Sequence, residues 1–401
     1  MKYNQKFLKS QNQGKIIELL KKHEARSRAQ LSKDLGISRS TVSEIINEMI
    51  KWNIIYEGEK VIGNLGKRPT LLYFNKDFYY FIALVITPES IKVAVCNLNG
   101  EILKEKKITL PEDISAKDII ELSMKNIDEI VSHFDRDKMC LISAGSPETF
   151  NVKTGVIKFA PYDRDWVGVD LRSIFKEQYG VDVIVKLHIK LETLGEQWKS
   201  YNNISNMIYL AVGRGVGAGV IIDGEVREGN NGYLGEIAFL PISEKMDYNE
   251  LKKGDKNLGY FESKCDTKYI GKLVKEYCKK KGMKNGFNDF DSIAQLYKEN
   301  TGIKELINKN ILRTLALGIA STIVMLDPEI VVLNGEIVKL GADFLNLLKK
   351  EIYDITPYRR KIVFSKLEDK SGIYGAIING LNVIEKSIFE NAESFYSINR
   401  E

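Results

Sequence analysis

Apolar residues recur at helical spacing through the N-terminal part of the chain. Residues 14–22 contain such a run and predict a first helix. Ser27 followed by Gln30 is the signature of a capping box, and it predicts a short second helix that ends at Gly36. Ser38 is placed to cap a third helix, whose expected buried stripe is Val42, Ile45, Ile46, Met49 and Ile50. The pattern therefore predicts three helices with a tight turn between the last two.

The opposite face of the third helix is polar, and we expect it to be exposed. It carries Ser38, Arg39, Ser40, Thr41, Ser43 and Asn47. Short hydroxyls, an amide and a guanidinium near the start of such a helix suit base edges and phosphates. The alternatives are a plain three-helix bundle with a polar surface and a module that contacts another protein.

A hairpin is predicted after the third helix. Two β-prone runs, residues 60–62 and 70–74, enclose a loop with two glycines. Lys67 and Arg68 lie at its tip, where basic side chains suit phosphates or the narrow minor groove. Helix, turn, helix and wing in this order predict a DNA-binding module.

From Tyr79 onward the pattern changes to alternating strands and helices. Strands are expected at residues 81–86, 91–98 and 101–106, and again at 207–212, 218–222 and 225–227. The turn Asp223-Gly224 of the second set matches the turn Asn99-Gly100 of the first. Helical segments follow each set, at residues 116–133 and 301–326. The repetition predicts an α/β body of two similar lobes with a cleft between them.

The charge of the chain is unevenly distributed. Residues 1–76 contain 15 Lys and Arg against 7 Asp and Glu, whereas the remaining 325 residues contain 44 against 47. An excess of positive charge confined to the predicted DNA-binding module is what phosphate binding requires. The start of the chain lacks the apolar core of a signal peptide, and no apolar run approaches the ~18 residues of a membrane span. We therefore expect a cytoplasmic protein without a membrane partner.

The four cysteines and a glycine-rich loop are the first candidates for site chemistry. The cysteines have no CxxC spacing, which argues against a disulfide framework and a cysteine zinc site and favours buried free thiols. Residues 213–219 contain four glycines between two apolar strands. Such a loop lets the backbone approach a phosphate or a sugar, although a tight turn without a ligand has the same composition.

Several motifs together resemble the ROK family, which comprises sugar kinases and sugar-responsive repressors. Residues 210–224, then Gly229, Gly232 and the segment Gly235-Glu236-Ile237, are similar to the family signature. Residues 66–69, 194–196 and 327–335 resemble its repressor branch. The resemblance implies an actin-like, hexokinase-type fold for the two lobes. We expect a winged helix-turn-helix domain at residues 1–76, a first actin-like lobe at 77–187 plus 374–401, and a second lobe at 188–373.

The chain departs from the pattern of the family's kinases at two places. Residues 85–89 match the loop that approaches ATP phosphate, but they carry Pro88 and Glu89 instead of glycine and a hydroxyl. His188 stands where the kinases have the aspartate that deprotonates the sugar hydroxyl. His188 can in principle accept a proton, so the alternative of an active sugar kinase with a fused DNA-binding domain stays open. We expect no kinase activity.

The family's zinc segment is also altered. Residues 253–260 stand in its place without a cysteine, and Phe239 replaces the histidine that completes the site. We therefore expect neither a bound metal nor another cofactor.

Part of the family's sugar site is retained. Glu236 and Glu262 match carboxylates that contact sugar hydroxyls, for which paired acceptor oxygens are suited. Leu187 matches a sugar-lining asparagine, so the site has become more apolar. The candidate effector-binding residues are Glu236, Glu262, His188, Phe239, Gly213 and Gly215. Tyr233, Tyr260 and Trp166 are candidates for stacking on a sugar face, or else belong to the core of a vestigial site.

These features together predict a transcriptional regulator, in the first place a repressor of carbohydrate-utilisation genes such as those of xylose metabolism. We expect it to bind a palindromic double-stranded operator as a homodimer or tetramer, because pairing of half-sites is the usual route to specific affinity. A carbohydrate effector is expected to change its affinity for DNA.

Overall fold

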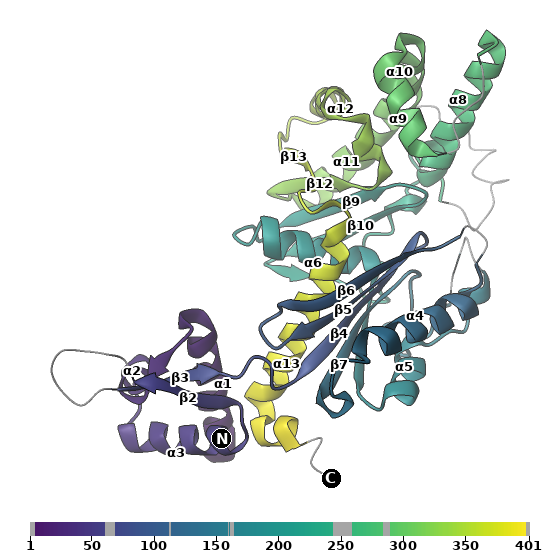
Figure 1. Ribbon diagram of the computed structural model, residues 1–401. Coiled ribbons are helices and arrows are strands. Elements are labelled where there is room, and N and C mark those ends of the chain that lie inside the picture. Colours follow the sequence, from purple (N-terminus) through teal and green to yellow (C-terminus); the bar gives the residue numbers. More distant parts are fainter. Residues whose placement is uncertain are drawn as a thin grey trace.

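The computed structural model describes residues 5–60, 69–111, 114–158, 160, 164–243, 259–283 and 289–397. Figure 1 shows a small N-terminal module at one end of an elongated body that is built on two sheets. The predicted α/β class, with a winged helix-turn-helix ahead of a two-lobed body, is confirmed.

The N-terminal module combines three helices with a small antiparallel sheet of order β1-β3-β2. Its elements are α1 (Gln5–His23), β1 (Arg26–Ser27), α2 (Arg28–Leu35), α3 (Arg39–Lys51), β2 (Ile55–Lys60) and β3 (Thr70–Phe74). The capping box of Ser27 and Gln30 is present, and Gly36 ends α2 at a positive φ of 67°. Ser38 caps α3 by accepting from the Thr41 N–H at 3.1 Å. The capping residues were therefore predicted correctly.

Two boundaries of the module differ from the prediction. The helix α1 begins at Gln5, well before residue 14, because its polar first half is supported by a distant helix: Ser10 Oγ donates to the Ile388 carbonyl at 3.1 Å. The first strand of the hairpin is β2, which starts at Ile55 and not at residue 60. Its apolar start is paired with the end of β3, where Ile55 lies opposite Phe74.

The body contains two five-stranded sheets of the same topology. The orders are β6-β5-β4-β7-β8 and β11-β10-β9-β12-β13, and in each sheet the first two pairings are antiparallel and the last two parallel. The strands are β4 (Tyr80–Ile86), β5 (Ser90–Asn97), β6 (Ile102–Thr109), β7 (Met139–Ser146), β8 (Asp182–Leu187), β9 (Met207–Val212), β10 (Val216–Ile222), β11 (Glu225–Val226), β12 (Ile330–Asn334) and β13 (Lys361–Phe364). The predicted repetition is confirmed, including the turn at Asp223 and Gly224, which both have positive φ.

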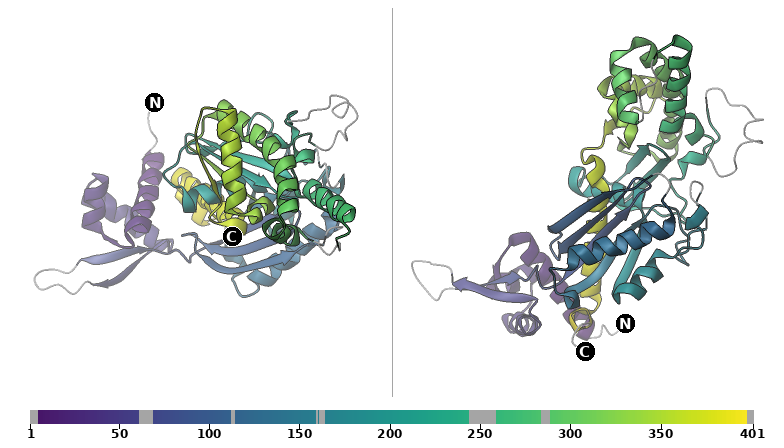
Figure 2. Two further views of the ribbon diagram at one scale, coloured as in Figure 1. Left: turned by 90° about the horizontal axis from the view of Figure 1, so that it is seen from above. Right: turned by 45° about the vertical axis from the view of Figure 1, so that its right-hand side comes forward.

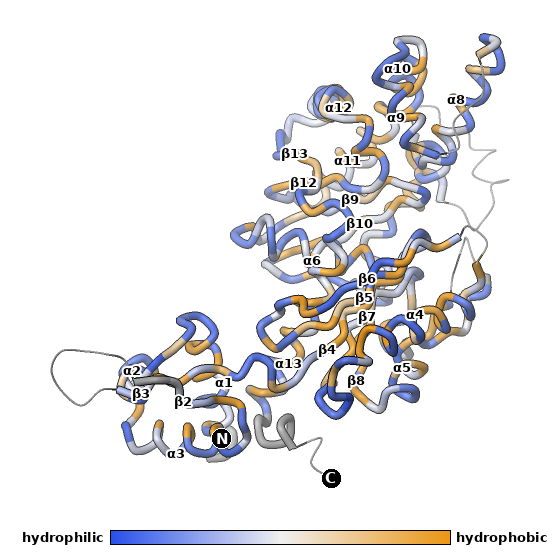
Figure 3. The backbone as a smooth tube through the Cα atoms, viewed as in Figure 1, coloured by the Kyte–Doolittle hydropathy of each residue, from blue (hydrophilic) through white to orange (hydrophobic). Residues whose placement is uncertain are grey.

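Helices cover both faces of each sheet (Figures 1 and 2). The helices of the body are α4 (Ala116–Val131), α5 (Leu171–Tyr179), α6 (His188–Ser200), α8 (Thr267–Lys281), α9 (Phe290–Glu299), α10 (Thr301–Ile307), α11 (Arg313–Leu326), α12 (Ala342–Ile355) and α13 (Ser371–Ser397). Of these, α8, α9 and α10 pack against one another at the end of the body farthest from the N-terminal module (Figure 1). The strand β4 is buried along its whole length, because alternate residues face α4 and α13. Figure 3 shows the same concentration of apolar residues on the strands of both sheets.

The helical run from Thr301 to Leu326 is long and apolar enough to cross a membrane. No run of this kind was expected from the sequence. Half of its most apolar window is buried within the protein. Leu315, Ile319 and Ile323 pack into the core of the second lobe. The run is accounted for as a core helix.

The helices α6 and α13 cross between the two sheets at very close range. A Cβ on Gly195 would lie 1.9 Å from the Ser371 carbonyl oxygen, and a Cβ on Gly375 would lie 1.7 Å from the Leu191 carbonyl oxygen. Glu196, fully buried at this crossing, accepts from Ser365 Oγ at 2.7 Å. The crossing therefore depends on glycine in both helices.

The helix α13 continues from this crossing to the N-terminal module, where it lies beside α1 (Figures 1 and 2). Its residues Ile377, Ile384 and Ile388 belong to one hydrophobic cluster that includes both Ile16 of α1 and Phe81 of β4. Lys21 and Glu385 add an ion pair of 2.9 Å at the same contact. The N-terminal module and the first lobe thus share a continuous core.

Candidate nucleic-acid interface and interlobe site

The polar face predicted for the third helix is exposed on α3. Val42, Ile45, Ile46 and Met49 are buried and orient the helix, whereas Ile50 is only half-buried. Of the candidate residues, Ser38, Arg39, Ser40, Thr41 and Asn47 are exposed and Ser43 is half-buried. The hydroxyl of Ser38 lies 2.7 Å from that of Ser40 and 2.8 Å from that of Thr41. The start of α3 therefore presents a cluster of hydroxyl groups beside the exposed Arg39.

The hairpin that follows α3 in the chain, formed by β2 and β3, has the position of a wing. Its strands β2 and β3 are held by stacking of Tyr56 on Tyr73, with ring centroids 5.4 Å apart. Lys67 and Arg68, predicted for the tip, lie outside the residues that the structure describes.

The glycine-rich segment divides into a short loop and a strand. Only residues 213–215 form the loop, in which the Gly213 N–H donates to the Gly215 carbonyl at 2.9 Å. Gly217 and Gly219 belong to β10, so the glycine-rich loop is shorter than residues 213–219 and the strand predicted from residue 218 begins at Val216. Residue 219 is glycine for packing, because a Cβ there would lie 1.8 Å from Thr193 Oγ1 of α6.

The two candidate carboxylates are both engaged. Glu262 is buried, with 3% of its surface exposed, and its Oε1 accepts from the Val216 N–H at 2.8 Å, beside the glycine loop. Glu236 is half-buried, and its Oε1 accepts from Thr149 Oγ1 at 2.5 Å. Thr149 follows β7 of the first sheet and Glu236 follows β11 of the second, so this hydrogen bond joins the two lobes.

His188 begins α6 immediately after β8. Its Nδ1 lies 3.2 Å from the Ser146 carbonyl oxygen, at the end of β7. A carbonyl oxygen can only accept, so this contact places the proton on Nδ1 and the lone pair of the neutral ring on Nε2. His188 is therefore held in one orientation at the first lobe.

A charged triad surrounds the segment after β11. Lys190 of α6 is buried with 1% of its side chain exposed, and its Nζ lies 2.6 Å from Glu228 Oε2 and 2.7 Å from the Gly232 carbonyl oxygen. Lys186 reaches the other carboxylate oxygen of Glu228 at 2.6 Å. Burial alone would raise the pKa of Glu228, but the two lysines lower it below its usual range. The triad fixes the segment that leads to Glu236.

The aromatic candidates do not form one cluster. Trp166 is 2% exposed and packs in the core of the first lobe, so of the two alternatives left open for it, stacking on a sugar or a place in the core, the second is correct. Tyr233 is 47% and Phe239 40% exposed. Leu187 is buried in the core beneath α6. Among the described residues no group of three His, Cys, Asp or Glu is placed to hold a metal ion, and most of the altered zinc segment lies outside them.

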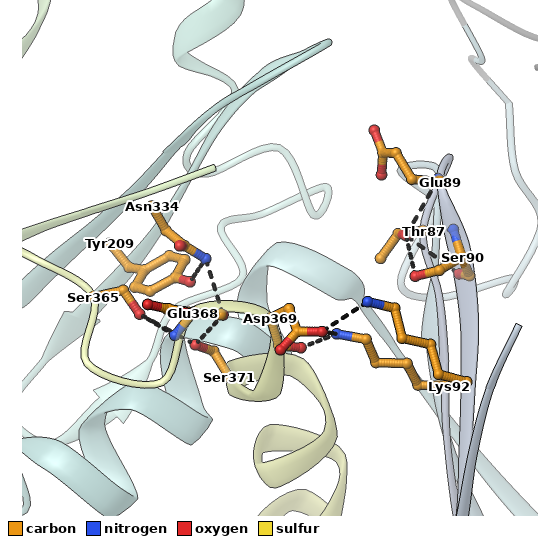
Figure 4. Close-up of polar contacts among 11 residues, drawn as sticks. Thr87, Glu89, Ser90, Lys92, Tyr209, Asn334, Ser365, Glu368, Asp369 and Ser371 are labelled. Atoms are coloured by element: carbon orange, nitrogen blue, oxygen red, sulfur yellow. Dashed lines mark hydrogen bonds and ion pairs between the residues drawn. The ribbon is translucent and has the colours of Figure 1, made fainter. Parts of the chain in front are cut away.

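The segment that matches the kinase phosphate loop is closed on itself (Figure 4). Thr87 Oγ1 accepts from the Ser90 N–H at 3.1 Å, and the Thr87 N–H donates to the Ser90 carbonyl at 2.9 Å. Pro88 offers no N–H, and Glu89 is exposed. Glu192 of α6 adds a second carboxylate at this junction, and burial raises its pKa. The turn thus uses its own donors internally and exposes the carboxylate of Glu89.

Two lysines of the first sheet hold the turn before α13 (Figure 4). Lys92 of β5 contacts the backbone carbonyl and the carboxylate of Asp369, and Lys107 of β6 lies 2.8 Å from the same carboxylate. Lys107 and Lys92 lower the pKa of Asp369, and burial lowers the pKa of Lys92. In the same turn, Asn334 of β12 donates to the Glu368 carbonyl. The first lobe and the second lobe therefore meet at the start of α13.

Sequence reasoning missed several of these residues. Thr149, Glu228 and Asp369 belong to no motif, and their partners are distant in sequence. An available signal was Lys190, a lysine at a position that the amphipathic pattern of α6 places in the interior.

Comparisons with known proteins agree with this arrangement. The sequence model of the ROK family matches residues 82–379, and a winged helix-turn-helix DNA-binding model matches residues 9–56. The xylose repressor of Caldicellulosiruptor bescii is 25% identical over 389 residues, which cover 93% of this chain and 96% of that protein.

Solved structures show the same fold. A ROK family transcriptional regulator, described as a homolog of the Escherichia coli Mlc protein, superposes with a TM-score of 0.74 at 19% identity, covering 98% of this chain and 99% of its own. A ROK family glucokinase from Streptomyces griseus, in complex with glucose and AMPPNP, covers 75% of this chain and 98% of its own, with a TM-score of 0.61 at 17% identity. The body is therefore shared with kinases, whereas the full-length match includes the DNA-binding module. The chain belongs to the ROK family and is a ROK transcriptional repressor with an N-terminal winged helix-turn-helix.

Proposed function

We propose that the exposed face of α3 reads the operator. The residues in contact with DNA are Ser38, Arg39, Ser40, Thr41, Ser43 and Asn47, together with Lys67 and Arg68 of the wing. The exposure of this face and the burial of the opposite one support the proposal. The operator is a palindrome bound by a homodimer or tetramer, since one small module makes few phosphate contacts. The protein acts in the cytoplasm.

Arg39→Ala is expected to lower affinity for an operator duplex at least tenfold, because each half-site loses a contact worth about 1–3 kcal/mol. The duplex is obtained by selection from a randomised pool with the full-length protein, and binding is measured by fluorescence anisotropy. Arg136→Ala, which removes an exposed arginine of the first lobe that pairs with Asp128, is the matched control. Equal affinity of the Arg39 variant and the control would contradict the proposed surface.

The body senses a carbohydrate through Glu236, Glu262, His188, Phe239 and the loop at Gly213 and Gly215. The observation that carries this proposal is the hydrogen bond between Thr149 and Glu236, because it joins the lobes through a retained candidate sugar carboxylate. A sugar hydroxyl that donates to Glu236 replaces the hydroxyl of Thr149 and so favours a different arrangement of the lobes. The xylose repressor among the relatives makes a pentose the first candidate.

A path from this site to the DNA-binding module is available through α13. The helix starts at the interlobe turn held by Asp369 and ends against α1. Because the cluster around Ile377 and Ile384 is continuous with the core of the module, a shift of α13 moves packed side chains on both sides. In the proposed domain division, α13 lies at the border of all three parts, which are residues 1–76, 77–187 plus 374–401, and 188–373.

Glu236→Gln is expected to weaken binding of the active sugar at least tenfold, and Thr149→Val to strengthen it severalfold, because the contact that competes with the sugar is removed. Isothermal titration with xylose, glucose, N-acetylglucosamine and their phosphates provides the measurement. Release of the selected duplex by the same sugar should be lost in the Glu236 variant. The absence of heat with every sugar would favour a vestigial site.

The alternative of an active kinase has less support. The turn at Thr87 is closed by its own hydrogen bonds and carries the exposed carboxylate of Glu89, which repels a phosphate, so we infer that the chain does not phosphorylate sugars. A coupled ATPase assay with the same sugars tests this inference. Turnover that disappears in a His188→Ala variant would reverse it.

A further inference from the structure

One residue outside the predicted DNA-contact surface lies directly against it. Arg28, the first residue of α2, directs its Nη2 to Asn47 Oδ1 of α3 at 3.1 Å. Its Nη1 lies 2.5 Å from Glu57 Oε1 of β2. The guanidinium therefore joins the second helix, the recognition helix and the first strand of the wing.

This contact determines which end of the Asn47 amide faces the protein. A guanidinium carries only donors, so the amide oxygen must lie toward Arg28 and the NH₂ group away from it. Asn47 is exposed on α3, so the NH₂ group is the part left for a base. At this position the helix presents donors and no acceptor.

Arg28 is an unsuitable phosphate contact in this arrangement. Both of its terminal nitrogens have protein acceptors, and the carboxylate of Glu57 balances its charge. The side chain is only 29% exposed in this arrangement. The geometry favours a role in contacts within the protein, to Asn47 and Glu57, over a contact with DNA phosphate.

In the major groove, a side chain that only donates and a side chain that both donates and accepts match different bases. Adenine is read by an asparagine that donates to N7 and accepts from N6, whereas guanine offers two acceptors, N7 and O6. We propose that Arg28 is a positioning residue that restricts Asn47 to donating, so that Asn47 selects guanine over adenine in each operator half-site. The inference rests on the proposed placement of Asn47 against DNA.

The test is selection of duplexes from a randomised synthetic pool by the full-length protein, followed by affinity measurements on single-base variants. Asn47→Ala should abolish a guanine preference at one position of each half-site. Arg28→Ala should change the guanine-to-adenine affinity ratio at that same position about tenfold in favour of adenine, and leave the other positions unchanged. Arg28→Lys keeps a donor for Asn47 Oδ1 but loses the planar fork, so it should change the same ratio in the same direction by a smaller factor.

Arg26→Ala is the matched control, because Arg26 of the same module pairs with Asp34 at 3.3 Å and does not contact α3 through this pair. Its effect should be the same for all duplexes. If Arg28→Ala also lowers affinity equally for every duplex and reduces the salt dependence, Arg28 contacts phosphate and the inference is overturned, while the proposed surface stands. If Asn47→Ala changes no base preference, both the inference and the placement of Asn47 are overturned.

Discussion

Gly375→Ala is expected to destabilise the protein by about 3 kcal/mol, as a lowered midpoint of thermal or denaturant unfolding. The added Cβ would lie 1.7 Å from the Leu191 carbonyl oxygen and 2.8 Å from the Leu191 Cα. Both are backbone atoms of α6, so no side chain can move aside, and the two helices must separate. Because α13 continues to α1, the same change should also weaken binding of a selected operator duplex.

A helical glycine without such a neighbour provides the control. In Gly271 of α8, an added Cβ would meet only Ile293 Cδ1 at 3.6 Å, which is ordinary contact. Gly271→Ala should therefore leave stability unchanged or raise it by up to about 1 kcal/mol, as expected from helix propensity. Equal unfolding midpoints for the two variants would show that α6 and α13 can separate at little cost.

Local signals made much of the N-terminal module predictable. The caps at Ser27 and Ser38, the stop at Gly36 and the buried stripe of α3 depend on residues a few positions apart, and they were predicted correctly except for Ile50, which is half-buried. The length of α1 was not, because its polar first half is stabilised by Ile388 at the other end of the chain. Hydrophobic periodicity cannot reveal a helix that is held by distant partners.

The body shows the same division between local and distant information. The two hairpins and their repeated turns predicted two similar sheets, since a turn at Gly100 or Gly224 is encoded by its own residues. The role of Gly219 was not predictable, because the sequence does not show that Thr193 packs against it. A glycine required for packing and a glycine required for a ligand have the same appearance in a sequence.

The residues proposed for the site came from the sequence, whereas their contacts came from the structure. Glu236 and Glu262 were found from the family pattern, whereas their partners Thr149 and Val216 came only from the fold. For Trp166 the sequence left core and site as alternatives, because an aromatic residue near a motif has no signal that separates the two. The proposed regulation depends on one of these contacts, since the Thr149 bond makes Glu236 part of the lobe junction.

Glu228→Gln is expected to destabilise the protein by about 3 kcal/mol, because it leaves the buried ammonium of Lys190 without its carboxylate. Glu228 has a pKa below its usual range in the folded protein. Its contribution to stability is therefore present above the pKa of the unfolded chain and is lost as pH falls through the lower folded value. The unfolding midpoint of the wild type should decline below about pH 5 more steeply than that of the variant.

Two further variants separate the buried charge from other causes. Lys190→Met in the Glu228→Gln background removes the unpaired ammonium, and it should recover part of the lost stability. Glu225→Gln removes a carboxylate from the neighbouring β11, where the pair with Arg227 is largely exposed, and should change stability by less than about 1 kcal/mol. If Glu228→Gln changed stability no more than Glu225→Gln, the triad would contribute no more than an exposed ion pair and would not influence the segment that carries Glu236. A large effect on both stability and sugar affinity would instead show that the triad keeps this segment in the position from which Glu236 reaches the first lobe.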